Sequence, residues 1–286
     1  MSDLTSLIKE LRNKSGAGFL DCKTALSENN NDIEKAIEYL RKKGLSKASK
    51  KTSREANEGA IGIYSNDKII TIVKVNSETD FAAKSDTFLN FLDQLGSVAL
   101  NESNANLNKE EFLKLKFNNS TVSEFFSNMI AKIGENLILK DLIIIENNSS
   151  SEFMFYIHNS YKDNIGKIAS LIKYETKEND ENIKTLSKNI CMHIAAMKPE
   201  SMDIDDLDKS IIEKEKNIQR ELILNSGKPS NIVDKILEGK MKKFYSEITL
   251  LNQAYILDQD KTIKSILEEY KNEYSYKLLS FNLISL

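Results

Sequence analysis

Histidine and cysteine carry the most versatile side-chain chemistry in proteins, and this 286-residue chain has only two of each. His158 and His193 do not lie at a spacing from other ligand residues that is typical of a metal site. Cys22 and Cys191 lie far apart, which indicates neither a zinc knuckle nor a disulfide framework but free cytoplasmic thiols. A nucleophile with a matching base is not recognisable either. We therefore expect no enzyme, no cofactor and no bound metal.

The two histidines have different expected surroundings. His193 lies in Cys191–Met197, a stretch with helical periodicity, where a packed or capping role is the default. His158 follows the strand-like run Phe153–Ile157 in a polar turn, and we expect it to be exposed. It is either a solvated loop residue or a contact to a partner, and its local sequence does not decide between the two.

The segment Thr79-Asp80-Phe81 sets an aromatic residue among charges. The preceding run Ile69–Val75 is β-branched and apolar, as in a strand, and apolar residues recur at helical spacing after Asp86. Phe81 therefore lies at a strand-to-helix junction. It either anchors the helix from inside or projects into a partner, and the local sequence favours the anchor.

The composition of the chain argues against nucleic acid, an acidic membrane surface and nucleotide as binding partners. The chain is 40% apolar and 29% charged with a net charge of -3, which gives no reason to expect nucleic acid or an acidic membrane surface. The basic runs Lys42–Arg54 and Lys240–Lys243 are interpreted as a solvated linker and a helix end. The sequence has no glycine-rich phosphate-binding motif, so we do not expect it to bind nucleotide itself.

Targeting signals are not apparent in the sequence. The N-terminus carries an acidic residue early and has no apolar run of signal-peptide length. No later segment approaches the roughly 20 apolar residues that a membrane helix needs. We expect a cytoplasmic protein without a membrane partner.

Three amphipathic helices are predicted within the first 44 residues. The third follows the turn Asn29–Asn31, with Asn31 as its N-cap and Gly44 at a left-handed C-cap. A glycine-containing turn between the first two helices presents Phe19 and Leu20. A unit this small could leave an apolar patch exposed.

The rest of the chain predicts an α+β fold with antiparallel sheets, because a strand pair followed by a helix occurs twice. The dipeptide Asn66-Asp67 suits a tight hairpin, and Gly and Pro within Ser226–Pro229 suit a turn between two helices. These patterns indicate a three-helix unit (1–45), a linker (46–58), a first mixed region (59–146), a second region that echoes it from residue 147, and a protruding helical pair.

Several sequence blocks follow one another over almost the whole chain. They are Leu11-Arg12, Ser15–Lys23 with Ala25-Leu26, Glu78–Phe81, Ala131–Asn136, His193–Pro199, Ser226–Pro229 and Glu238–Phe244. In this order they resemble the elongation factor Ts family of bacterial translation. The resemblance implies a guanine nucleotide exchange factor for elongation factor Tu, a GTPase. It also implies an N-terminal domain like a ubiquitin-associated module (1–45) and two related α+β core halves. The first half is 59–146, and the second is 147–202 with 245–286, interrupted by an inserted helical hairpin (203–244).

The resemblance also assigns partner-binding residues. In the family, the Thr-Asp-Phe motif penetrates the GTPase domain of the partner near its magnesium site, and the N-terminal helices touch that domain. The block at 131–136 supplies an apolar contact, and one histidine lies where the second core half meets another partner domain. The residues implied are Thr79, Asp80, Phe81, Arg12, Phe19, Leu20, Lys23, Ile133 and His158.

Two departures limit this transfer. Ala82 stands where the family commonly has valine, which we expect to loosen local packing. Longer members add a C-terminal helical module, and its contacts are expected to be absent here because the chain ends at Leu286. A homodimer through the 203–244 hairpin, as in some members, is an open alternative to a hairpin that folds onto its own core.

A different function class also fits the N-terminal helices. A non-catalytic adaptor would use the same exposed Phe19 and Leu20 to bind a peptide or a ubiquitin-like fold. The order of the family blocks favours exchange, and it reverses the local preference at the strand-to-helix junction. We therefore predict that Phe81 is substantially exposed and that Phe88, Phe91 and Leu92 anchor the following helix.

Overall fold

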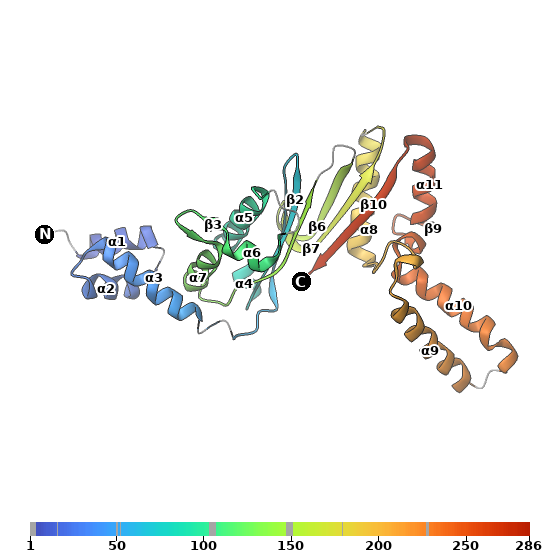
Figure 1. Ribbon diagram of the computed structural model, residues 1–286, viewed down its shortest axis with the longest axis horizontal. Coiled ribbons are helices and arrows are strands. Elements are labelled where there is room, and N and C mark those ends of the chain that lie inside the picture. Colours follow the sequence, from blue (N-terminus) through green and yellow to red (C-terminus); the bar gives the residue numbers. More distant parts are fainter. Residues whose placement is uncertain are drawn as a thin grey trace. The chain divides into compact units, whose positions relative to one another are not determined.

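The computed structural model describes residues 4–15, 17–49, 51, 53–102, 107–146, 151–178, 180–226 and 229–286. It divides into two compact units, residues 1–146 with 159–167 and 286, and residues 147–158 with 168–285. Each unit combines helices with antiparallel strands, so the fold is α+β, as the sequence predicts (Figure 1). Gly16 and Gly227, which the sequence places in turns, lie outside the described residues.

The N-terminal part of the first unit consists of the helices α1 (Leu4–Ser15), α2 (Phe19–Glu28) and α3 (Ile33–Ser49). The predicted ends of α3 are wrong in two details. Asp32, not Asn31, caps it, and the Asp32 carboxylate accepts a hydrogen bond from the Lys35 amide at 3.0 Å. Gly44 lies inside α3, which continues to Ser49. A Cβ at this position would come within 3.2 Å of the Ala131 Cβ. This glycine therefore serves the close approach of another helix, not a C-cap.

The rest of the first unit combines antiparallel strands with helices. The strands β1 and β2 form a hairpin, and the Asn66 side chain accepts hydrogen bonds from the amides of Lys68 (2.9 Å) and Ile69 (2.8 Å) in its turn. β5 pairs antiparallel with β2. The elements are β1 (Glu58–Ser65), β2 (Ile69–Ser77), α4 (Asp80–Ala83), α5 (Asp86–Leu100), α6 (Lys109–Lys114), β3 (Lys116–Phe117), β4 (Ser120–Thr121), α7 (Val122–Ile133) and β5 (Ile138–Glu146).

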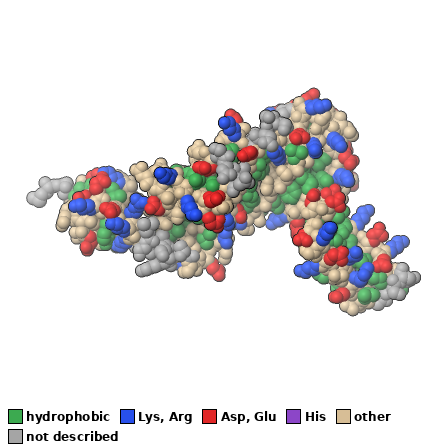
Figure 2. Space-filling model, in the orientation of Figure 1, with side chains coloured by type: hydrophobic (Ala, Val, Ile, Leu, Met, Phe, Trp, Pro, Cys, Tyr) green, Lys and Arg blue, Asp and Glu red, His purple; other side chains and the backbone are tan. Residues whose placement is uncertain are grey.

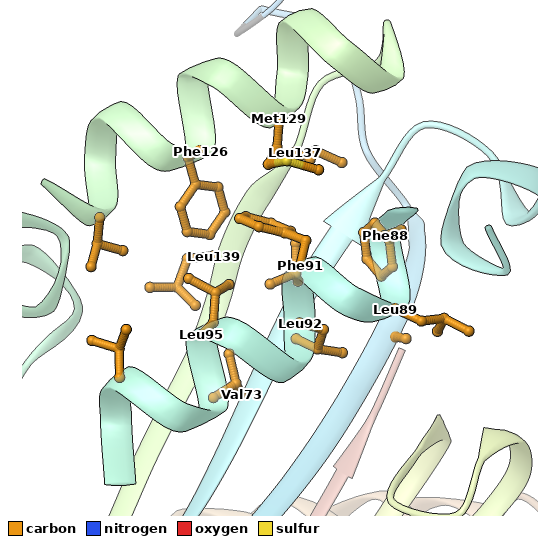
Figure 3. Packing of buried hydrophobic residues seen from close by; sticks show 14 of the residues in the cluster. Val73, Phe88, Leu89, Phe91, Leu92, Leu95, Phe126, Met129, Leu137 and Leu139 are labelled. Atoms are coloured by element: carbon orange, nitrogen blue, oxygen red, sulfur yellow. The ribbon is translucent and has the colours of Figure 1, made fainter. Parts of the chain in front are cut away.

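The core of this part of the unit is built by α5 between the sheet and α7 (Figure 3). Phe88, Phe91 and Leu92 of α5 are fully buried, which confirms them as the anchors of the helix. The Phe91 ring meets the rings of Phe125 and Phe126 edge to face, with both centroids 4.8 Å away. The ion pair between Arg41 and Glu124, 2.7 Å, joins α3 to α7.

The second unit repeats the order of strand pair and helix. β6 and β10 both pair with β7, and α8 and α11 pack against a core that includes the stacked rings of Tyr174 and Tyr276. α9 and α10 form a helical hairpin (Figure 1). The elements are β6 (Glu152–Lys162), β7 (Ile165–Glu175), α8 (Glu181–Met197), η1 (Ile204–Asp206), α9 (Lys209–Asn225), α10 (Ser230–Ile248), η2 (Leu250–Asn252), β8 (Ala254–Tyr255), β9 (Asp258–Thr262), α11 (Ile263–Tyr274) and β10 (Lys277–Ser285). Among the described helices, none is long and apolar enough to cross a membrane.

Replacing Phe91 by alanine should lower the free energy of unfolding by about 3–5 kcal/mol, because it leaves a cavity between two aromatic partners. Phe81→Ala is the matched control, since the Phe81 side chain is 84% exposed. It should change stability by less than about 0.5 kcal/mol. Urea unfolding followed by circular dichroism measures both, and equal losses for the two variants would contradict the packing described.

Candidate partner-binding surface

Phe81 lies on α4, a single helical turn between β2 and α5. Thr79 caps this turn, since its hydroxyl oxygen accepts a hydrogen bond from the Ala82 amide at 3.2 Å. Ala82 and Ala83 are buried, whereas Phe81 is 84% exposed. Because successive helical residues point about 100° apart, burying the two alanines directs Phe81 outward. The predicted exposure of Phe81 is confirmed.

A carboxylate from a distant part of the chain holds the start of this turn. Glu135 accepts two hydrogen bonds from Thr79, one from the backbone amide at 2.9 Å and one from the hydroxyl at 2.7 Å. Glu135 follows Gly134, whose φ of 89° ends α7 in the left-handed conformation. The carboxylate is thereby placed beside the junction between β2 and α4.

A second carboxylate, on the β2 side, accepts a hydrogen bond from the segment that carries Glu135. Glu78, next to the turn, accepts a hydrogen bond from the Asn136 amide at 2.7 Å. The Asn136 side chain in turn donates to the carbonyl of Arg54 at 2.8 Å, and the Arg54 guanidinium lies 3.4 Å from Glu78. Bonds to charged acceptors are stronger than neutral ones. We call Glu78, Glu135 and Asn136 the carboxylate clamp; the sequence showed them only as members of motif blocks and gave them no role.

Asp80 is paired within the turn itself. Its carboxylate lies 2.6 Å from the Lys84 ammonium, one helical turn later. The hydrogen bond from Lys84 lowers the pKa of Asp80 below its usual range, and the same bond raises the pKa of Lys84. Asp80 therefore presents a negative charge at the start of the turn.

The N-terminal site residues lie on α1 and α2. Phe19 and Leu20 open α2 and are 48% and 76% exposed, and Lys23 is exposed one turn later. Arg12 is exposed on α1. Two adjacent exposed apolar side chains beside cations are typical of an interaction surface. On the face shown in Figure 2, positive and negative side chains are interspersed, with no large area of one sign.

The remaining two candidates have different environments. Ile133 is half-buried and packs against the core of the first unit. His158 is exposed as expected, but the predicted polar turn is wrong: the residue lies within β6, which continues to Lys162. Its Nδ1 atom lies 3.1 Å from the hydroxyl of Tyr156. The apolar-to-polar change after Ile157 marks a strand leaving the core, not the end of the strand.

His193 has the packed role that its helical context predicts. It is fully buried, its Nε2 lies 3.0 Å from the Gln253 side-chain oxygen, and its Nδ1 accepts from the Ile256 amide at 3.3 Å. These partners require a neutral imidazole with its hydrogen on Nε2. Burial accordingly lowers the pKa of His193. Cys22 and Cys191 are free and buried, and the described residues include no group of three metal-ligating side chains that could hold an ion.

Comparison with known proteins defines the class. A family model described as Elongation factor TS matches residues 78–286. Relatives named Elongation factor Ts include the protein of Methylorubrum extorquens (strain PA1), 41% identical over 270 residues that cover 94% of this chain and 87% of the relative. Those of Allorhizobium ampelinum and Halothermothrix orenii are 37% and 43% identical, covering 96% and 92% of this chain and 88% and 86% of the relatives.

These matches define a translation elongation factor of the nucleotide-exchange class. The chain belongs to the elongation factor Ts family, and the resemblance of its sequence blocks is thereby confirmed.

Removing the Glu135 carboxylate should loosen the turn that carries Phe81. In Glu135→Ala we expect the Thr79 amide to exchange its hydrogen about fivefold faster, the value for loss of about 1 kcal/mol at a partly exposed site. Glu135→Gln should fall in between, because its amide oxygen still accepts one bond. Hydrogen exchange followed by NMR measures this, with Glu110→Ala on α6 as the control. Equal rates in the Glu135→Ala and Glu110→Ala proteins would contradict the clamp.

His193 should make stability depend on pH. Its folded pKa is lowered from an ordinary value of 6.5, so between the two values the unfolded chain binds a proton that the folded chain does not. The stabilisation is fully present above pH 6.5 and is lost as pH falls toward the folded pKa. We expect His193→Gln to flatten the fall in unfolding free energy between pH 7 and pH 5, as measured by urea titrations. An unchanged slope would exclude His193 as the source.

Proposed function

We propose that this protein binds elongation factor Tu in the cytoplasm and promotes release of GDP by inserting the turn Thr79-Asp80-Phe81 near the Mg²⁺ site of the GTPase domain. The observation that carries the proposal is a phenylalanine that is 84% exposed on a turn whose start is hydrogen-bonded to Glu135 and Asn136. An exposed side chain on a fixed support is suited to insertion, since little conformational freedom is lost on binding.

The physical basis of exchange is linkage. A factor that binds the nucleotide-free partner better than the loaded one weakens nucleotide binding by the same ratio. Mg²⁺ requires near-ideal octahedral geometry, so a small displacement of a coordinating loop weakens nucleotide binding. Burying a phenylalanine contributes about 1.5–3 kcal/mol, which corresponds to a factor of roughly 10–150 in affinity. Insertion of Phe81 therefore contributes to the free energy that couples binding of this protein to release of GDP, and no covalent chemistry is needed.

The other candidates have supporting roles in this proposal. Asp80, whose carboxylate lies 2.6 Å from the Lys84 ammonium, accepts a hydrogen bond from the GTPase domain. Arg12, Phe19, Leu20 and Lys23 contact the same domain from the N-terminal helices. A second partner domain meets His158, and Ile133 adds an apolar contact. These contacts hold the two proteins in register while the wedge enters.

A homodimer through the 203–244 hairpin is a further part of the proposal. Ile211, Ile218 and Leu222 of α9 are 38%, 42% and 54% exposed. Their spacing of seven and four residues places them on one face of the helix. A face of this kind is suited to packing against a second helix of the same kind.

Phe81→Ala should reduce the stimulation of GDP release at least tenfold, because the wedge is lost while the turn is retained. Release of a fluorescent GDP analogue from elongation factor Tu, at several concentrations of the variant, measures the effect. Leu257→Ala is the matched control, since Leu257 is 60% exposed but lies on the second unit. Undiminished stimulation by Phe81→Ala would overturn the wedge. A complex that excess GDP and Mg²⁺ fail to dissolve would favour the adaptor.

A further inference from the structure

A small apolar pocket lies in the second unit, formed by α11, the start of β10, η2 and the segment after α8. Its volume is about 190 Å³. The apolar side chains that line it include Met202, Leu251, Leu267 and Leu278, and all four are half-buried. They pack against the core of the unit on one side and leave apolar surface open on the other. The proposed exchange function uses none of these residues.

The rim of this pocket is positively charged. Lys264 and Lys271 of α11 and Lys277 at the start of β10 are exposed, and Glu268 is the acidic residue among them. Among the described residues, none of these three lysines forms an ion pair, whereas the nearby Lys261 is paired with Glu269 at 2.8 Å. The pocket therefore has an excess of two positive charges on a chain whose net charge is -3. The net charge around the pocket is therefore positive, whereas the net charge of the whole chain is negative.

We propose that this pocket, bounded by Lys264, Lys271 and Lys277, binds an acidic peptide segment of a protein partner through one large apolar anchor side chain. The apolar floor takes the anchor, and the lysines take carboxylates on either side of it. An apolar anchor in a pocket with complementary charges around it is the usual arrangement of a peptide hot spot.

The size of the pocket selects a peptide side chain over a free small molecule. Sites for drug-sized ligands and cofactors have volumes of about 300–1,000 Å³. A volume of about 190 Å³ holds less than such a ligand and suits a single leucine, methionine or phenylalanine side chain. Met202 in the wall adds an unbranched side chain that adapts to different anchors.

The charges and the anchor predict separable effects. Interactions between exposed charges weaken as salt is added, because the Debye length falls from about 10 Å at 0.1 M to about 3 Å at 1 M. The apolar contact does not weaken in this way. Binding should therefore fall with salt but not vanish, and it should need both the anchor and the acidic flanks.

The test uses the full chain and fluorescein-labelled hexapeptides with two glutamates on each side of a central serine and one anchor, which is Leu, Met or Phe. Fluorescence anisotropy in 50 mM NaCl is expected to show saturable binding of at least one anchor peptide. Lys264→Glu with Lys271→Glu should weaken it at least tenfold. Lys261→Glu, a reversal outside the pocket, should change it less than threefold. Leu267→Ser should weaken it with no change in the circular dichroism spectrum.

Four results would overturn the proposal. The first is no binding of any anchor peptide up to 1 mM. The second is equal binding of a peptide with serine in place of the anchor, which reduces the pocket to a charge effect. The third is binding of anionic phosphatidylserine vesicles that the double reversal abolishes while the peptides do not bind, which assigns the lysines to a lipid surface. Loss of binding in Lys261→Glu equal to that in the double variant also contradicts it.

Discussion

The hydroxyl group of Thr79 is the point on which the candidate exchange surface depends. It donates to the Glu135 carboxylate at 2.7 Å and accepts from the Ala82 amide at 3.2 Å. A hydroxyl that donates to a charged acceptor becomes a better acceptor itself, so the two bonds reinforce each other. One side chain thus joins the cap of α4 to a segment 56 residues away in the sequence. The direction of Phe81 follows from these two bonds and from the burial of Ala82 and Ala83.

Two phenylalanines of similar local context have opposite environments for a geometric reason. Phe88 enters α5 on the face that meets the sheet, and it is fully buried. Phe81 is on a one-turn helix whose inward positions are taken by Ala82 and Ala83, whose small side chains allow α4 to lie close to β1 and β2. Ala82 is only 8% exposed, so its side chain belongs to this close contact. Helical phase, not hydrophobicity, decides which ring is exposed.

Sequence reasoning predicted the features that follow from local patterns. The α+β class and the buried anchors of α5 come from periodicity of two and of 3.6 residues, and the hairpin at Asn66 comes from its turn dipeptide. The sequence predicts a C-cap at Gly44, because a glycine at a helix end and a glycine at a helix crossing have the same local signature. The difference depends on Ala131, which is distant in sequence. The carboxylate clamp was missed for the same reason, since its partners come together only in the folded chain.

A polar clamp suits this turn better than apolar packing would. Phe81 is 84% exposed and contributes little to folding, so its free energy of transfer from water, about 1.5–3 kcal/mol for full burial, remains available for binding. That free energy reaches a partner only if the turn does not rearrange, because reordering of the backbone costs about 1–2 kcal/mol per residue. Apolar residues around Phe81 would draw its ring into the core. Directional hydrogen bonds to Glu135 and Glu78 fix the backbone and leave the ring in solvent.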